Sequence, residues 1–282
     1  MIAFLGTGHL GANFVKALLN KGNKVQVWNR TAQKAKMLET NGAIACENII
    51  DAVKGVNRIH LTLKDDAAVD EVLTLASEGF TDNVIITDHT TTSKAGAIKR
   101  TEYWQAKGYT YLHAPVFMGP QNALESTGFM LVSGSQELIA LLEPELSAMT
   151  GKVINFGTET GKASGIKLIG NLLLVSINAG FADMLALTKA MDIPVSDVEG
   201  LFNIWNPGIM LPARLKKMTA DTFDQPTWEL AMARKDVGLM IEEARQGGVP
   251  LAIMPAIAAE MDNWISNGHG KDDYTVVAKN NI

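Results

Sequence analysis

The sequence predicts an α/β protein, with a doubly wound, mostly parallel sheet in its first half and an all-helical second half. Short apolar or β-branched runs alternate with helix-length stretches through the first half of the 282 residues, the pattern of successive βαβ units. After residue 160 no convincing strand occurs. We expect two domains, residues 1–158 and 159–282, joined by a long helix over 162–191.

Each expected element follows from its residues. The strand-like runs are short and rich in β-branched, Leu and aromatic residues, and they cover 2–5, 24–29, 58–63, 83–88, 109–114 and 128–134. The helical stretches between them cover 9–21, 32–41, 67–78, 93–107 and 136–149. In the second half, prolines punctuate helical patterns over 162–191, 195–204, 227–246 and 250–266.

Composition excludes several classes of protein. A hydrophobic fraction of 47% with 20% charged residues is the ordinary balance of a folded chain, and a net charge of −5 offers no basic surface for nucleic acid. The single cysteine, Cys46, can form neither an intrachain disulfide nor a cysteine metal cluster. With no secretory signal at the start, we expect a cytoplasmic protein without a metal.

A glycine-rich turn, GTGHLG, directly follows the first strand-like run. It contains the cofactor-binding candidates Gly6, Gly8, His9, Leu10 and Gly11. Glycines here allow the backbone to approach a pyrophosphate, and the following helix N-terminus offers free N–H groups to it. A plain tight turn is the alternative, because glycine-rich turns are common. The context favours a dinucleotide-binding loop in a Rossmann-type sheet.

The end of the second strand predicts which dinucleotide binds. NAD binders usually carry Asp or Glu there for the ribose 2′-hydroxyl, whereas this chain has Asn29, Arg30 and Thr31. A guanidinium binds a 2′-phosphate with charge-assisted bonds and stacks on adenine, so we expect NADP(H) to be preferred over NAD(H). Alternatively, Arg30 is a solvated loop residue and Thr31 caps the next helix.

Two further strand ends point to the same crevice, because open α/β sheets bind ligands at the carboxyl ends of their strands. Leu63 and Lys64 are candidates to line the nicotinamide ribose. Thr90, Thr91 and Thr92 are candidates to hydrogen-bond the ribose or carboxamide. Any one of the threonines is equally suited to cap the following helix.

A polar seam interrupts the apolar helix at 162–191. At about 100° per residue, Asn171 lies about 40° and Asn178 about 20° from Lys167. These residues, with Asp183, argue against a membrane span. We expect Asn178 to have a structural role and no role in catalysis.

Lys167 and Asn171 are the candidates for catalysis. Hydride transfer to a carbonyl builds negative charge on oxygen, which an ammonium stabilises and protonates; in the oxidative direction the neutral amine takes the hydroxyl proton. An amide one helical turn away fixes the position of the oxygen. The alternative is a buried lysine paired with a carboxylate or backbone carbonyls, which ties two domains together.

Five segments in this order resemble the β-hydroxyacid dehydrogenase family, which includes 3-hydroxyisobutyrate dehydrogenases: GTGHLG, WNRT, HAPV, GKASGIKLIGN and KDVGLMIEEA. The resemblance covers essentially the whole chain. It implies a Rossmann domain, a long interdomain helix and a helical domain, assembled as homodimers or homotetramers. It also assigns proton transfer to Lys167, orientation of the substrate oxygen to Asn171, and contact with nicotinamide or substrate to Lys235, which Asp236 accompanies. An exposed helix pair is the alternative for the last two.

The substrate loop departs from the family pattern D-A-P-V-S-G-G. The substrate-binding candidates are Val116, Phe117, Met118 and Gly119, of which Phe117 replaces the serine and Met118 the first glycine. His113 replaces the acid, and we expect a hydrogen-bonded structural histidine there. Two bulky apolar side chains suit a carboxylate poorly, so a larger, less polar aldehyde or ketone is favoured.

The lysine motif of the family, G-x-G-x-x-x-K-x-x-N-N, departs as well. Ala163 stands for its second glycine and Gly170 for its first asparagine. The apolar substrate loop is also similar to that of the imine reductases, NADPH-dependent relatives of the same architecture. Those enzymes generally replace the lysine with Asp or Tyr, so the retained Lys167 favours carbonyl chemistry.

The leading interpretation is an NADP-dependent oxidoreductase that moves hydride between nicotinamide and a carbonyl or alcohol of β-hydroxyacid or semialdehyde type, with Lys167 as general acid/base. Imine reduction of a hydrophobic substrate is a second enzymatic interpretation. A non-catalytic NADP-binding sensor or scaffold is an alternative of another class. The presence of both Lys167 and Asn171 argues against it. We expect a small-molecule substrate and no partner among nucleic acids or membranes.

Overall fold

The computed structural model describes residues 1–281. The chain divides into two compact units, Met1–Leu172 and the residues from Leu173 onward. The helix α8 (Lys162–Ala190) contributes residues to both units. The boundary at 158/159 stays a prediction.

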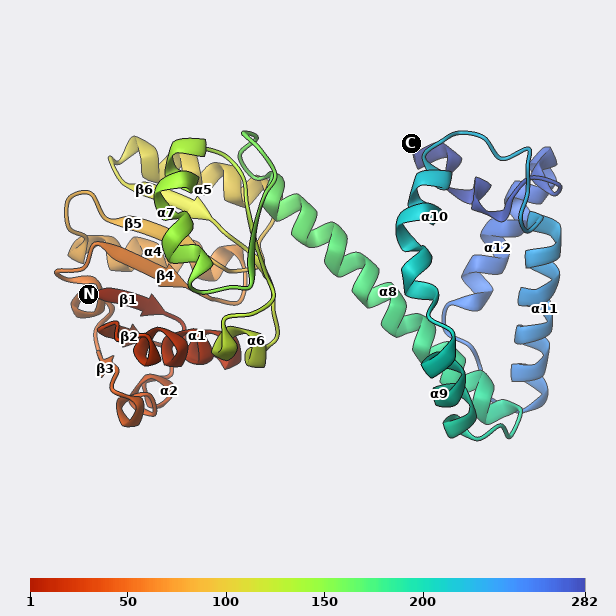
Figure 1. Ribbon diagram of the computed structural model, residues 1–282, viewed down its shortest axis with the longest axis horizontal. Helices are drawn as coiled ribbons and strands as arrows, with labels where there is room; N and C mark the ends of the chain where they lie inside the picture. The colour runs from red at the N-terminus through yellow and green to blue at the C-terminus, as the bar shows by residue number, and fades with distance from the viewer. Residues whose placement is uncertain (282) are drawn as a thin grey trace. The chain divides into compact units, whose positions relative to one another are not determined.

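A six-stranded, all-parallel sheet forms the centre of the first unit (Figure 1). Its strand order is β3-β2-β1-β4-β5-β6, and the strands are β1 (Ile2–Leu5), β2 (Val25–Trp28), β3 (Ile44–Ala45), β4 (Arg58–Leu61), β5 (Ile85–Asp88) and β6 (Thr110–His113). The doubly wound sheet expected from the sequence is confirmed. The strand order reverses between β1 and β4, and ligands of open α/β sheets bind at such a point.

Helices cover both faces of this sheet, and each face has its own apolar core. The helices are α1 (His9–Asn20), α2 (Ala32–Lys36), α3 (Ile49–Val53), α4 (Asp66–Ala76) and α5 (Lys94–Ala106). Phe4 and Phe14 belong to one core cluster, and Leu5 and Trp104 to the other. Successive residues of β1, Phe4 and Leu5, therefore pack on opposite faces of the sheet.

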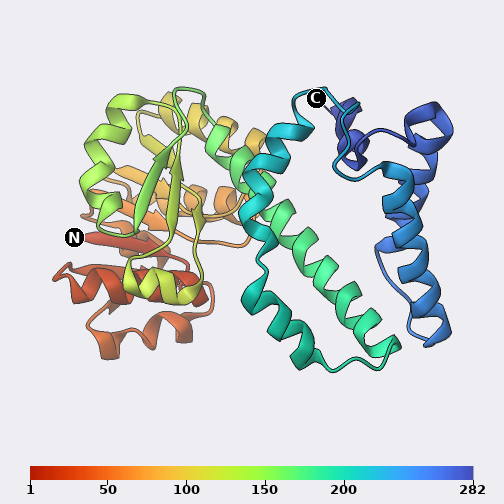
Figure 2. The ribbon, with the colours of Figure 1, turned by 45° about the vertical axis from the view of Figure 1, so that its right-hand side comes forward.

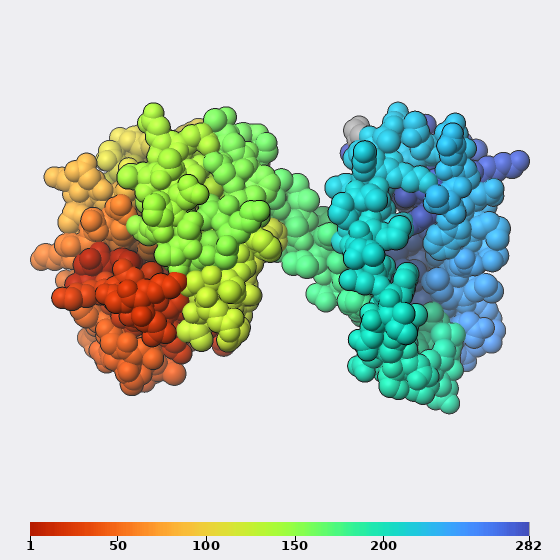
Figure 3. All heavy atoms as spheres, in the orientation of Figure 1, coloured from red at the N-terminus to blue at the C-terminus, as the bar shows by residue number. Residues whose placement is uncertain are grey.

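A second, three-stranded sheet follows, with β7 (Val116–Phe117), β8 (Phe129–Val132) and β9 (Lys152–Asn155), drawn in green in Figure 2. The strand β7 pairs antiparallel with β8, and β9 pairs parallel with it. The predicted strand at 128–134 is thus present, but it lies outside the main sheet. Two helices accompany the small sheet, α6 (Pro120–Glu125) and α7 (Gln136–Ser147), and α1 packs against α6 (Figure 3).

The second unit is helical. After α8 it contains α9 (Val195–Ile204), α10 (Leu211–Met218), α11 (Leu230–Gln246) and α12 (Met254–Trp264). Leu230, Val237 and Met261 contribute to its core. The carboxylate of Asp183 accepts the backbone N–H groups of Ala252, Ile253 and Met254 at 2.6–3.0 Å, so this polar residue of the apolar helix holds the start of α12.

One helix of the described residues, α8, is long and apolar enough to cross a membrane by length and composition alone. Core helices of soluble proteins pass the same test. Several of its large side chains are exposed, among them Ile169 at 66% and Val175 at 68%.

Candidate dinucleotide and catalytic site

The glycine turn after β1 leaves the start of α1 open to a ligand. Gly8 precedes the helix, no side chain caps it, and its first turn carries no acidic residue. A Cβ at Gly8 would meet no atom within 4 Å, whereas one at Gly11 would lie 2.0 Å from the carbonyl oxygen of Gly6. The buried hydroxyl of Thr7 also lacks a hydrogen-bond partner among the described residues. Gly11 thus serves the fold, and Gly8 keeps the helix end accessible to an anion.

Substitution of these two glycines should separate stability from binding. We expect Gly11→Ala to lower the midpoint of thermal unfolding, because its methyl group would overlap backbone. We expect Gly8→Ala to unfold as the wild type does but to bind NADPH more weakly, because its methyl group would project where the phosphates approach. Differential scanning fluorimetry without cofactor and fluorescence titration with NADPH measure the two effects. Equal NADPH affinity of Gly8→Ala and wild type would contradict the placement of the pyrophosphate.

A cleft of about 600 Å³ lies between the loops that follow β1, β2 and β4. Its lining includes Gly6, Gly8, Trp28, Asn29, Arg30, Thr31, Lys34, Leu63 and Lys64. The structure therefore brings together the predicted residues from three separate strand ends. Lys34, in α2, is a basic residue that sequence reasoning missed. Its position three residues after Thr31, on the first helical turn, is the signal that could have found it.

Of the residues at the end of β2, some are bonded within the protein and others are free to contact a ligand. The amide of Asn29 accepts the backbone N–H of Thr7 at 3.0 Å and donates to the carbonyl oxygen of Thr31 at 3.0 Å, which ties two loops of the cleft together. Thr31 precedes α2, yet its side chain makes no capping bond. Arg30 is exposed and forms no ion pair within residues 1–281. Its guanidinium is therefore available to a phosphate.

Hydrogen bonds to neighbouring segments hold the loop after β5 in place. The Thr90 hydroxyl accepts the backbone N–H of Leu63 at 3.0 Å, and Thr90 and Thr92 are both buried, whereas Thr91 is exposed. Ser93, not a threonine, caps α5 by accepting the N–H of Gly96. Of the three threonines, only Thr91 presents its side chain to solvent.

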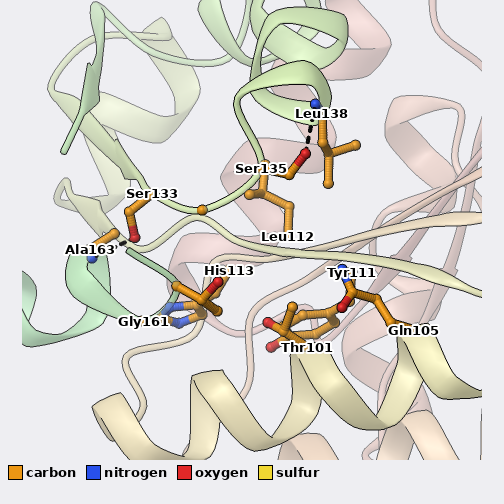
Figure 4. Close-up of a pocket in the computed structure, with 12 residues that line it drawn as sticks. Thr101, Gln105, Tyr111, Leu112, His113, Ser133, Ser135, Leu138, Gly161 and Ala163 are labelled. Carbon is orange, nitrogen blue, oxygen red and sulfur yellow. Dashed lines mark hydrogen bonds between the residues drawn. The ribbon is translucent and has the colours of Figure 1, made fainter. Parts of the chain in front are cut away.

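His113, at the end of β6, supports this threonine loop. Its Nε2 lies 2.8 Å from the carbonyl oxygen of Thr90 and 3.1 Å from the Thr92 hydroxyl. Because a carbonyl only accepts, Nε2 carries the proton, and Nδ1 has no partner among the described residues. Burial lowers the pKa of His113, so the ring is neutral. The ring lines a small cavity of about 40 Å³ (Figure 4), and its bonds are those expected of a structural histidine.

The first turn of α8 is anchored to this threonine loop and to the residue that follows β8. The backbone N–H of Ala163 donates to the Ser133 hydroxyl at 2.9 Å (Figure 4), and the Ser164 hydroxyl donates to the carbonyl oxygen of Thr92 at 2.6 Å. Both contacts lie less than two turns from Lys167. Sequence reasoning missed Ser133 and Ser164 as anchors, because hydroxyls of this kind are common at turns and helix starts.

Lys167 and Asn171 lie side by side on α8, as expected. The ammonium donates to the amide oxygen of Asn171 at 3.0 Å and lies 4.1 Å from the centre of the Phe117 ring. Lys167 is 8% exposed and forms no salt bridge with a carboxylate of residues 1–281. Burial therefore lowers the pKa of its ammonium. A buried, unpaired lysine beside an amide has the chemistry of a proton donor to an oxygen.

The remaining predicted residues lie in the small sheet and in the second unit. Phe117 belongs to β7, Met118 packs against the core that contains Phe4, and the N–H of Gly119 donates to the Asn122 side chain at 2.9 Å. In the second unit Lys235 lies on α11 and pairs with Asp236 at 2.9 Å. The contacts assigned to Lys235 by the family resemblance stay a prediction.

The fold and the cleft define a dinucleotide-binding protein, and comparison with known proteins defines its family. Residues 1–157 match the NAD binding domain of 6-phosphogluconate dehydrogenase, and the chain belongs to this family. It is 26% identical to the 3-sulfolactaldehyde reductase of Escherichia coli, over 98% of this chain and 94% of the relative. It is 29% identical to the 3-hydroxyisobutyrate dehydrogenase of Pseudomonas aeruginosa, over 90% and 89% of the two chains.

The fold also matches a solved structure, an imine reductase from Myxococcus stipitatus in complex with NADP+. The TM-score is 0.91 at 21% identity, over 99% of each chain. Family and relatives together identify the protein as an oxidoreductase that binds a nicotinamide dinucleotide.

Proposed function

We propose that the protein is an NADP-dependent oxidoreductase that interconverts a carbonyl compound and an alcohol, with Lys167 as general acid/base. The observation that carries the proposal is the ammonium of Lys167. It is buried, has no carboxylate partner within residues 1–281, and is hydrogen-bonded to Asn171. A buried charge without a counter-ion is costly, and such groups gather at functional sites.

The cleft fits a dinucleotide with a 2′-phosphate. The uncapped start of α1, with open space at Gly8, would hold the pyrophosphate. Arg30 and Lys34 line the same cleft and supply positive charge where the 2′-phosphate of NADP would lie. No carboxylate stands at the end of β2 to repel it.

Nicotinamide, when reduced, supplies a hydride to the carbonyl carbon. As the π electrons move onto oxygen, Lys167 donates its proton there, which leaves an alcohol and a neutral amine. Asn171, one helical turn from Lys167, accepts a hydrogen bond from the ammonium, and its amide would position the reacting oxygen beside that proton donor. In the reverse direction the neutral amine of Lys167 accepts the hydroxyl proton.

Imine reduction is a second candidate, favoured by the Phe117 ring against Lys167, which makes the site less polar. A panel of aldehydes, ketones, hydroxy acids and cyclic imines, run with NADPH and with NADH, tests the proposal. We expect turnover of carbonyl compounds with NADPH. Turnover of imines alone would favour the second candidate, and NADPH binding without any turnover would favour a sensor or scaffold.

We also propose that the chain assembles as a homodimer or homotetramer in the cytoplasm. The exposed apolar side chains of α8 support a protein interface on that helix, and the single free cysteine suits a reducing compartment. Sedimentation equilibrium should give a multiple of the 30.4 kDa chain mass.

A further inference from the structure

We propose that Phe117 and Gly170 act as one coupled determinant of substrate specificity, which directs the enzyme to carbonyl compounds without a carboxylate. The inference rests on the proposed carbonyl chemistry at Lys167 and adds the class of substrate. It depends on the space that the two residues share.

The Phe117 ring fills the place of a side chain at position 170. A Cβ at Gly170 would lie 2.3 Å from Cζ of Phe117 and 3.0 Å from its Cε1. Both distances are far below the van der Waals contact of two carbon atoms, which is about 3.5–4.0 Å. As long as the ring stays there, position 170 accepts only glycine. Phe117 in place of the family's serine and Gly170 in place of its asparagine are therefore two parts of one structural change.

The same ring covers the ammonium of Lys167. With Nζ 4.1 Å from the ring centre, the contact is a cation–π interaction, which stabilises the charge without bringing an anion or water to it. The ring therefore keeps the proton donor in a dry, apolar setting. Burial lowers the pKa of Lys167, whereas the cation–π contact favours the charged form and opposes that shift.

Apart from Lys167 and Asn171, which the proposed function gives to the reacting oxygen, a carboxylate would find few hydrogen-bond donors on this wall. The ring of Phe117 and the glycine at 170 provide none, Met118 packs into the core, and the N–H of Gly119 is already donated to Asn122. Burying a carboxylate against such a surface is costly. An uncharged aliphatic or aromatic group on the substrate would instead gain contact with the ring.

A double-mutant cycle tests the coupling, with Phe117→Ser, Gly170→Asn and the double variant compared with wild type. We expect Gly170→Asn to lower the midpoint of thermal unfolding and Phe117→Ser to relieve much of that loss in the double variant. Gly165→Asn is the matched control on the same helix, since a Cβ there would meet its nearest atom at 3.7 Å. Strictly additive shifts of the midpoint would overturn the coupling.

The same four chains test specificity with 4-oxobutanoate and pentanal, unbranched aldehydes of similar length of which only the first carries a carboxylate. We expect wild type to prefer pentanal and the double variant to shift the ratio of kcat/KM toward 4-oxobutanoate by about tenfold or more. Turnover with an unchanged ratio, or a wild-type preference for 4-oxobutanoate, would overturn this inference and leave the proposed function standing. Absence of turnover in all four chains, with any carbonyl compound of the panel, would instead overturn the proposed function itself.

Discussion

Replacing Lys167 with alanine is expected to lower kcat by about 10²- to 10⁴-fold, the usual contribution of a general acid, and to leave the dissociation constant of NADPH nearly unchanged. The variant loses the proton donor to the developing oxyanion. It does not touch the cleft that contains Gly8 and Arg30. Steady-state kinetics with the best carbonyl substrate and a fluorescence titration with NADPH measure the two quantities.

Lys162→Ala is the matched control, because Lys162 lies on the same helix and is exposed. We expect it to keep wild-type turnover. If Lys167→Ala turned over substrate as wild type does, the proton-transfer role would have to be abandoned.

The pH profile should carry the signature of the same lysine. In reduction the cationic form is active, so kcat falls as pH rises through the pKa of Lys167. Because burial lowers that pKa, the fall should come at a lower pH than the value of an ordinary lysine, and the oxidative rate should rise over the same interval. A reductive profile that stays flat up to pH 10.4, about the pKa of a free lysine, would contradict this.

Replacing Arg30 with aspartate is expected to weaken NADPH binding by about 10- to 100-fold, the worth of one charge-assisted hydrogen bond to a phosphate. NADH binding should change only a few-fold, because the adenosine ribose then carries no phosphate. The new carboxylate would repel the 2′-phosphate and accept from the 2′-hydroxyl of NADH. Titration of wild type and variant with each dinucleotide gives the ratio of the NADPH and NADH dissociation constants.

Lys24→Asp makes the same change of charge next to the opposite end of β2 and serves as the control. It should weaken neither dinucleotide specifically. An equal loss of NADPH and NADH affinity in Arg30→Asp would remove the argument for a 2′-phosphate site. In that case Lys34, on the same cleft, would be the next basic residue to test.

Local patterns were enough to predict the main architecture. β1, β4 and β5 are largely buried on both faces of the sheet. β1 is therefore a continuous apolar run, and the other two carry Ile and Leu next to the buried polar residues His60 and Thr87. The two-residue strands β3 and β7 and the five-residue helix α3 were not predicted, because elements so short hold no full period of a hydrophobic pattern.

The candidate site shows the same division. The seam of Lys167 and Asn171 could be predicted because a four-residue spacing on one helix sets their distance. The anchoring of α8 through Ser164 and Thr92 could not, since the two residues are 72 positions apart. Only the sheet topology brings them together.

The sequence by itself determined the strand–helix alternation, the glycine turn and the helix that carries Lys167, because propensity, periodicity and steric freedom act over a few residues. The tertiary structure decided which of the candidate side chains are engaged. It ties Asn29 and Thr90 into the protein, leaves Arg30 open and sets the Phe117 ring against Gly170. The physical reason is that hydrogen bonds and excluded volume between distant segments depend on where the fold places each strand end, and no local pattern records that.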